Sequence, residues 1–362
     1  MDEYTNRLNS LFDNSDMDYV ILLNAAGKNS NFLYMSGLKN GLFEGAILLL
    51  SKNKMELLTS ILEYEEAIIG KNSITDVIKI SNREDYAKHL FKKAENKIIA
   101  LDFASLPYKS YKNLKKLLKP KKIIDISGKL QEMRLIKTEN ELKQIKKAAS
   151  ITKQVFNVIE NDFKIGVTEL DLAAKIDYIM MTNGAQEPSF TSIVSFGSNA
   201  ALPHHMSSNA KLKENSFVLL DIGSKYNNYC SDMTRTFIFK PDKKSDKYKR
   251  MSDMYDVVLE AQKRAFNSLK EGVLGKVPHN IAMDYINNYK NGIYKGKFIH
   301  SLGHSIGLDV HDNPSIGLSS NVNVKIKQNM VFSDEPGIYI NGFGGVRIED
   351  DVLITKNGAK FL

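Results

Sequence analysis

The chain has 362 residues, enough for about two domains and a large buried core. Its hydrophobic fraction of 43% and charged fraction of 25%, with 22 Gly and 8 Pro, exclude a collagen-like or disordered chain. The single cysteine, Cys230, excludes an internal disulfide and a cysteine-based zinc site.

The balance of 50 basic against 42 acidic residues raises the question of a nucleic-acid partner. The densest basic stretch, residues 112–122, interleaves leucines at helical spacing, which is typical of a surface helix with a solvated lysine face. We therefore expect no nucleic-acid partner. The first residues do not resemble a signal peptide and no apolar run reaches the length of a membrane span, so a cytoplasmic protein with no membrane contact is expected.

Residues 1–129 alternate short apolar strands with helical segments. No glycine spacing typical of a phosphate loop occurs in this part of the sequence. The pattern predicts an N-terminal α/β domain, with strands at Tyr19–Leu23, Gly45–Leu50, Ile98–Phe103 and Ile123–Ile126 and helices at Glu84–Glu95 and Lys109–Leu118.

From residue 130 the pattern changes to longer helices followed by hairpins. A capping-box signature at Thr138 and Glu141 opens one helix, and Thr168 opens a second. Strands are then predicted at Phe217–Gly223 and Tyr229–Ile238, on either side of a polar turn.

The same order of elements recurs in the second half. One helix is predicted to begin near Ser252 and another after Pro278, and a strand pair surrounds Asn341–Gly345. The spacing from Thr138 to Ser252 equals that from Asp221 to Glu335. We therefore predict a duplicated helix-helix-hairpin unit, and hence an α+β domain, over residues 130–362.

The first predicted hairpin carries two carboxylates. If its turn centres between Tyr226 and Asn227, Asp221 and Asp232 lie directly opposite each other, with Cβ atoms about 4.5–5.5 Å apart. Two unpaired carboxylates at that separation repel each other, whereas a divalent cation between them removes the repulsion. The pattern therefore indicates a metal site at this hairpin.

The second hairpin repeats the arrangement. Glu335 and Glu349 pair if its turn centres on Gly342, and four converging carboxylates suit two metal ions about 3.5–4 Å apart. His304 is the best candidate for an imidazole ligand, since the glycines beside it allow a close backbone approach. A HExxH zinc helix is excluded, because no glutamate follows His300.

These residues lie in segments that resemble the pita-bread metallopeptidases of family M24. The resemblance is to the Xaa-Pro branch, which contains aminopeptidase P and prolidase. It spans nearly the whole chain, and the matching segments follow one another in the same order as in the family. The segments that carry it are Asn199–His204, Leu220–Gly223, Ser231–Phe237, Phe298–His304, Gly307–His311, Glu335–Tyr339 and Gly345–Glu349.

The resemblance implies a fold and a metal centre. Residues 1–129 are expected to form a creatinase-like α/β domain and residues 130–362 the pita-bread catalytic domain. The resemblance implies two divalent metal ions per subunit. Manganese or cobalt is the expected metal, and zinc or iron is the alternative. The implied metal ligands are Asp221, Asp232, His304, Glu335 and Glu349.

The resemblance also implies catalytic roles. A hydroxide between the two metals would attack the peptide, and Glu335 would take up and return the proton. His204 and His311 would hydrogen-bond the substrate carbonyl and the tetrahedral intermediate. Arg347 would contact the substrate or, alternatively, form a salt bridge that orients Glu349.

Three positions depart from the family pattern. Ser305 replaces a glycine after the metal histidine, and Asp312 replaces a glutamate. Ser315 stands where dipeptide-specific prolidases carry an arginine that would bind the substrate carboxylate. We therefore expect an Xaa-Pro aminopeptidase that cleaves between an N-terminal residue and a following proline. The alternative is a prolidase acting on Xaa-Pro dipeptides.

Two alternative functions are less consistent with the sequence. Methionine aminopeptidases normally lack an N-terminal domain of this size, and non-catalytic pita-bread binding proteins lose ligands that are all present here. The expected partners are proline-containing peptides and, by analogy with relatives, a second copy of the chain in a homodimer.

Overall fold

The computed structural model describes residues 2–25, 29–312 and 317–362. It divides into two compact units, residues 1–134 and 135–362. This boundary falls near the end of helix α6 (Ser127–Leu135), whereas the boundary expected from the sequence, 129/130, falls within that same helix.

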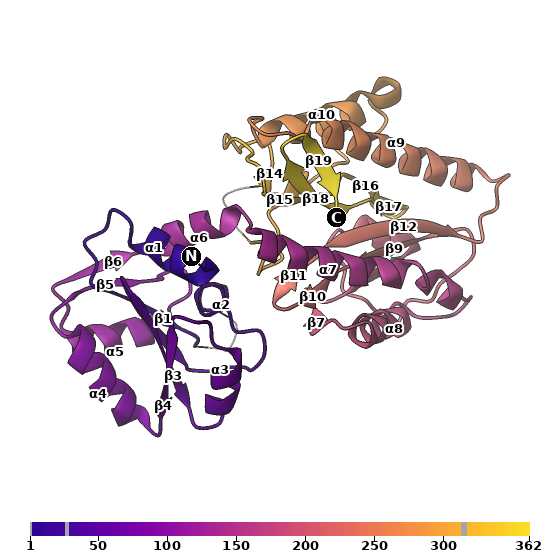
Figure 1. Cartoon of the computed structure of the whole chain (residues 1–362). Coiled ribbons are helices and arrows are strands. Elements are labelled where there is room, and N and C mark those ends of the chain that lie inside the picture. Colours follow the sequence, from indigo (N-terminus) through magenta and orange to yellow (C-terminus); the bar gives the residue numbers. More distant parts are fainter. Residues whose placement is uncertain (1, 26–28, 313–316) are drawn as a thin grey trace. The chain divides into compact units, whose positions relative to one another are not determined.

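The first unit is an open α/β sheet with strand order β4-β3-β2-β1-β5-β6. Figure 1 shows α4 and α5 on one side of this sheet and α2 and α3 on the other. The predicted α/β class is confirmed. Its elements are α1 (Glu3–Phe12), β1 (Tyr19–Leu23), α2 (Ser30–Ser36), β2 (Ile47–Ser51), β3 (Lys54–Ser60), α3 (Tyr64–Gly70), β4 (Thr75–Ile80), α4 (Arg83–Ala94), β5 (Ile98–Leu101), α5 (Tyr108–Leu118) and β6 (Lys122–Asp125).

The sequence analysis missed β3 and β4. Strand β3 carries a buried glutamate, Glu56, which interrupts its apolar pattern. Two side chains of α4 neutralise this carboxylate: His89 Nε2 lies 2.9 Å from Oε2, and Lys93 Nζ lies 3.2 Å from Oε1. A buried carboxylate is tolerated here because both of its oxygens have partners.

The second unit holds two helix pairs with strands between them (Figure 1). Among the described residues, no helix has the length and hydropathy that a bilayer span requires. The first half of the unit contains α7 (Glu139–Phe156), α8 (Glu169–Thr182), β7 (Glu187–Pro188), β8 (Ile193–Phe196), β9 (Ser216–Ile222), β10 (Ser224–Tyr226), β11 (Tyr229–Cys230) and β12 (Met233–Phe239). The second half contains α9 (Asp246–Ser268), α10 (Lys276–Asn288), β13 (Gly303–His304), β14 (Gly317–Leu318), β15 (Val331–Asp334), β16 (Gly337–Ile340), β17 (Gly344–Arg347), β18 (Asp350–Thr355) and β19 (Gly358–Phe361).

The predicted recurrence of helix, helix and hairpin is confirmed in element order. The predicted capping boxes at Thr138 and Thr168 are also present. Helix α9, however, begins at Asp246 after the cap Ser245, so the predicted start at Ser252 is wrong. The spacing from Thr138 to Ser252, which equals that from Asp221 to Glu335, therefore does not join equivalent helix starts.

Strand β9 lies between the cores of the two halves, and every one of its residues is buried. Side chains alternate across a strand, so Val218 and Leu220 pack into the core of α7 and α8. Phe217 and Leu219 pack into the core of α9 and α10. Asp221 continues this second series and therefore points toward the second half of the unit.

The register predicted for the first hairpin is wrong. Asp221 pairs with Thr234, not with Asp232, because the turn lies between Asn227 and Asn228. Both asparagines have positive φ, 48° and 70°, which is typical of a two-residue hairpin turn. The shift of two positions keeps Asp232 on the same sheet face as Asp221, so the two carboxylates still converge.

The register predicted for the second hairpin is confirmed. Gly337 pairs with Arg347 and Asp334 pairs with Asp350, so the intervening Glu335 and Glu349 face each other across the two strands.

The turn conformation of Asn228 leads to a stability prediction. A β-branched residue is strained at positive φ, so Asn228→Val is expected to lower the free energy of unfolding by about 1–2 kcal/mol. Asn228→Gly, which has no Cβ, is the matched control and is expected to change it by less than about 0.5 kcal/mol. Urea unfolding of both variants measures the difference. Equal losses in the two variants would contradict the turn assignment.

Candidate metal centre

A cavity of about 520 Å³ opens in the second unit. Its volume is within the usual range of small-molecule sites. Every site residue predicted from the sequence lines it: His204, Asp221, Asp232, His304, His311, Glu335, Arg347 and Glu349.

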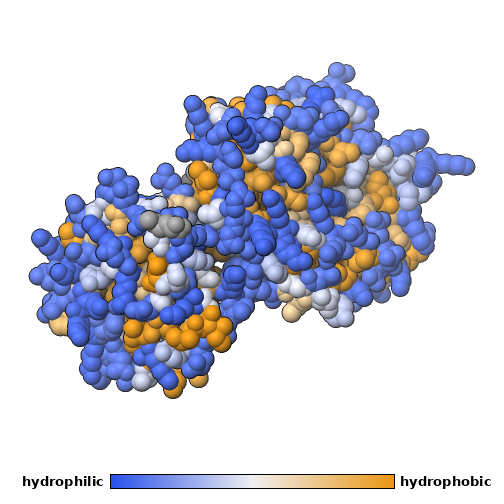
Figure 2. Space-filling model, viewed as in Figure 1, coloured by the Kyte–Doolittle hydropathy of each residue, from blue (hydrophilic) through white to orange (hydrophobic). Residues whose placement is uncertain are grey.

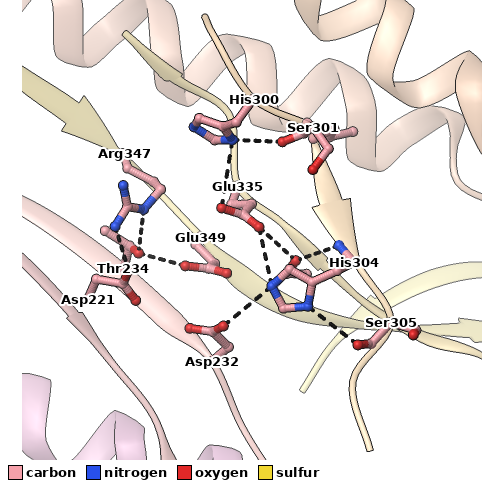
Figure 3. A network of polar contacts seen from close by, with 12 residues as sticks. Asp221, Asp232, Thr234, His300, Ser301, His304, Ser305, Glu335, Arg347 and Glu349 are labelled. Carbon is pink, nitrogen blue, oxygen red and sulfur yellow. Dashed lines mark hydrogen bonds and ion pairs between the residues drawn. The ribbon is translucent and has the colours of Figure 1, made fainter. Parts of the chain in front are cut away.

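The acidic side chains reach the cavity from both hairpins (Figure 3). Asp221 is the last residue but one of β9, and Asp232 directly precedes β12. Glu335 follows β15, and Glu349 lies between β17 and β18. Four carboxylates from two sheets therefore converge on one space.

His304 joins this cluster from β13. Its Nε2 atom lies 3.4 Å from Glu335 Oε1 and 3.6 Å from Asp232 Oδ2. The close backbone approach expected at Gly303 is present, since a Cβ atom there would lie 1.9 Å from the carbonyl oxygen of Ser333. The ligand atoms of Asp232, His304 and Glu349 all lie within 4.8 Å of one another.

The donor set fits divalent cations. Asp221 Oδ1, Asp232 Oδ1 and Glu349 Oε1 are buried and have no hydrogen-bond partner. Buried carboxylate oxygens without partners are costly in a folded protein. Oxygen-rich ligands with one imidazole suit manganese, cobalt, zinc or iron, so cations at these atoms would remove the cost.

Burial and mutual repulsion change the acid–base properties of the cluster. Burial, with repulsion from Asp221, raises the pKa of Glu335 to about 8. Burial and the neighbouring carboxylates also raise the pKa values of Asp232 and Glu349 well above their usual range. Burial lowers the pKa of His304 to about 3. The metal-free site therefore favours neutral groups, and the imidazole is ready to act as a ligand.

Arg347 stands at the other side of the cluster and is almost fully buried. Its Nη2 atom forms an ion pair with Asp221 Oδ2, and Nη1 donates to Tyr339 Oη at 2.9 Å. Its Nε atom donates to Thr234 Oγ1 at 3.0 Å, and that hydroxyl donates to Glu349 Oε2 at 2.6 Å. Arg347 thus holds Asp221 directly and Glu349 through Thr234, as Figure 3 shows.

Ser333 orders the histidine side of the site. Its Oγ atom accepts from the backbone N–H of His304 at 3.0 Å and donates to Glu335 Oε1 at 3.1 Å. His300 lies farther out, with Nδ1 3.9 Å from Glu335 Oε2 and Nε2 2.8 Å from Tyr339 Oη. Burial lowers the pKa of His300 to about 4, so it is neutral at physiological pH.

The two histidines predicted on the substrate side are exposed within the cavity. The rings of His304 and His311 lie 4.1 Å apart. Partial desolvation by the cavity walls, together with the nearby His204, lowers the pKa of His311. Both exposed imidazoles are available to hydrogen-bond a bound molecule.

The sequence analysis missed four residues that order the site: Thr234, Ser333, Tyr339 and His300. The sequence could have indicated two of them. Thr234 lies two positions after Asp232 and Ser333 two positions before Glu335, and residues two apart in a strand share a face. Tyr339 and His300 are far apart in the sequence, and only the fold brings their side chains into contact. Ser315, on which the preference for an aminopeptidase rested, lies outside the described residues.

Both units match known families. Residues 143–356 match metallopeptidase family M24, and residues 5–136 match the creatinase/prolidase N-terminal domain.

Similar proteins are known over the whole length. A Xaa-Pro dipeptidase of Pyrococcus horikoshii is 35% identical over 362 residues, covering 100% of this chain and 97% of that protein. The solved Xaa-Pro dipeptidase from Bacillus anthracis has a TM-score of 0.87 at 32% identity, over 99% of this chain and 96% of its own. The solved X-Pro aminopeptidase from Thermotoga maritima has a TM-score of 0.88 at 30% identity. The match covers 99% of this chain and 97% of that chain.

The raised carboxyl pKa values predict how the stability of the metal-free protein depends on pH. Glu335 has a folded pKa near 8 against an ordinary value of 4.5, so the folded state binds more protons than the unfolded state between these values. The free energy of unfolding therefore falls as pH rises through this window. From pH 7 to 8 His300 and His304, with lowered pKa values, are neutral in the folded state and largely neutral in the unfolded one.

We therefore expect the Tm of the protein in chelator to fall from pH 7 to pH 8. Manganese should abolish this fall, since cations bind the deprotonated carboxylates. Glu335→Gln should weaken the fall, and the control Asp246→Asn, at an exposed salt bridge, should not. Differential scanning fluorimetry measures all four cases. A chelated wild-type protein whose Tm rises over this range would contradict the prediction.

Proposed function

The chain belongs to metallopeptidase family M24, and from that premise we propose that it is a dinuclear Xaa-Pro peptidase of the prolidase type. The observation that carries the proposal is the cavity in which four carboxylates, the partly buried neutral imidazole of His304 and the two exposed imidazoles of His204 and His311 converge. The same convergence opposes a non-catalytic binding protein, which has no need of buried carboxylate oxygens without partners.

The choice of prolidase over aminopeptidase follows the relatives. The full-length sequence relative from Pyrococcus is named a Xaa-Pro dipeptidase, which is the activity that the sequence analysis ranked second. The argument for an aminopeptidase rested on Ser315 alone. We therefore place dipeptides with a C-terminal proline first as substrates, and longer peptides with proline in the second position as the alternative.

The metal ligands in this proposal are Asp221, Asp232, His304, Glu335 and Glu349. Two divalent cations there would supply a hydroxide nucleophile near neutral pH and polarise the scissile carbonyl. Manganese or cobalt is the proposed metal. Arg347 and Thr234 fix the carboxylates on one side and Ser333 fixes Glu335 on the other, so the ligands need little rearrangement.

The remaining residues handle the substrate and the proton. Glu335, whose Oε1 accepts from Ser333 Oγ and whose raised pKa of about 8 suits proton transfer, would accept a proton and return it to the leaving proline nitrogen. His204 and His311 are exposed in the cavity and would donate hydrogen bonds to the carbonyl oxygen as charge develops on it. Arg347 is engaged with Asp221, so we assign it an orienting role ahead of direct substrate contact.

The assay compares a dipeptide with a tripeptide. With manganese, the protein is expected to hydrolyse Leu-Pro much faster than Leu-Pro-Gly. Asp232→Asn is expected to reduce the rate by about 10³-fold or more, because it removes several kcal/mol of charge stabilisation. Asp246→Asn is the matched surface control and should retain full activity. Hydrolysis of the tripeptide alone would establish the aminopeptidase alternative, and hydrolysis of neither would overturn the proposed function.

A homodimer in the cytoplasm completes the proposal. Figure 2 shows apolar surface in the region of α3, where Leu62 is 90% and Ile69 is 80% exposed. Exposed apolar patches of this kind mark protein interfaces. The cytoplasmic location rests on the single, buried cysteine, which suits a reducing compartment.

The oligomeric state can be measured directly by light scattering. The wild-type protein is expected at twice the chain mass of 40.8 kDa. The double variant Leu62→Lys, Ile69→Lys places two charges in the apolar patch and is expected at the chain mass. Lys71→Glu, on exposed surface next to α3, is the control and should remain dimeric. A monomeric wild type, or a double variant that stays dimeric, would contradict this interface.

A further inference from the structure

We propose that Glu169 is a positioning residue of this peptidase, which holds the segment 196–208 so that His204 faces the cavity. The inference rests on the proposed function, because it assigns to His204 a contact with substrate. Nothing in the sequence motifs marks Glu169, which appears there only as the residue after the helix cap Thr168.

Glu169 is completely buried, and its carboxylate accepts five hydrogen bonds from one short segment. Oε1 accepts from the backbone N–H of Phe196 at 2.8 Å and from Asn199 Nδ2 at 2.9 Å. Oε2 accepts from the backbone N–H and the Oγ of Ser208 at 2.9 and 2.6 Å. His205 Nε2 lies 2.8 Å from the same oxygen. One side chain thus ties together both ends and the middle of the segment.

The carboxylate is charged in this environment. Although burial opposes ionisation, the hydrogen bonds from Ser208, His205 and Asn199 lower the pKa of Glu169. Its place in the first turn of α8 adds a favourable interaction with the helix dipole. Charge-assisted hydrogen bonds are about twice as strong as neutral ones, so the contact is a strong clamp on the segment.

His204 depends on this clamp because it is placed by its backbone. It adjoins His205, the residue that contacts Glu169, and it lies exposed at the cavity wall. Within the described part of the chain, the His204 side chain makes no hydrogen bond to another protein group. Its imidazole therefore points where the segment 196–208 directs it, and releasing the segment moves it.

Glu169→Gln is the sharpest test because it keeps the size of the side chain. The amide nitrogen that replaces one oxygen faces hydrogen-bond donors, which loosens the segment. We expect kcat/KM for an Xaa-Pro peptide to fall by about 10–100-fold, since small displacements of a group that contacts the reacting atoms have effects of this size.

A double-mutant cycle separates positioning from general destabilisation. If Glu169 acts through His204, Glu169→Gln has no further effect on kcat/KM in a His204→Ala background. A loss of the same factor in both backgrounds overturns the inference. Glu56→Gln is the matched control, since Glu56 is also buried and paired with a histidine but lies in the other unit. It should leave kcat/KM unchanged, and a loss equal to that of Glu169→Gln would overturn the inference.

Two further measurements keep the test decisive. Manganese affinity should be the same in Glu169→Gln as in wild type, because Glu169 contacts none of the proposed ligands. Amide hydrogen exchange in residues 196–208 should accelerate, and unchanged exchange overturns the inference even if the wild-type protein hydrolyses no Xaa-Pro peptide. An inactive wild type with accelerated exchange would refute the proposed function alone. Should Glu169→Gln fail to fold, Ser208→Ala removes the 2.6 Å contact with Glu169 and one local bond from the Ala210 N–H, and the same cycle and exchange outcomes decide.

Discussion

The structure of the second unit is organised by the need to hold three buried carboxylates and the partly buried Glu335 in one cavity. Each of these groups loses hydration, and together they repel one another, which raises the pKa values of Asp232, Glu335 and Glu349. Such a cluster persists only where opposite charge and hydrogen-bond donors offset the cost. Arg347 and Thr234 supply part of this compensation, and we propose that divalent cations at the unpartnered oxygens supply the rest.

The duplicated fold provides the rigid support for this cluster. Strand β9 packs into the cores of both halves, so Asp221 is fixed from two sides. The second hairpin contacts the first directly, since the backbone N–H of Glu349 donates to the carbonyl oxygen of Thr234 at 3.1 Å and Thr236 Oγ1 donates to the carbonyl oxygen of Arg347 at 2.9 Å. The carboxylates of two separate hairpins are therefore close enough together to share the same cations in the proposed site. In our proposal, Glu169 extends the same principle to His204 by holding the segment 196–208.

Sequence reasoning recovered the fold class, and the eight side chains that it grouped line one cavity, because alternation along strands fixes which residues share a face. It misjudged the first hairpin register, since the positive φ at Asn227 and Asn228 that sets the turn was not recognised. It missed β3 because a buried Glu56 breaks the apolar pattern. Tyr339, His300 and Glu169 could not be assigned roles from sequence, since their contacts join residues far apart in the chain and no local pattern encodes those distances.

The central claim is that the carboxylate cluster is a site for two divalent cations. Calorimetric titration of the chelator-treated protein with manganese at pH 7.5 tests it most directly. Since Glu335 and its neighbours hold protons in the metal-free state, binding should release protons and the apparent enthalpy should vary with the ionisation enthalpy of the buffer. The account predicts two ions bound per chain with proton release. Binding of no ion, or of a single ion without proton release, would contradict it.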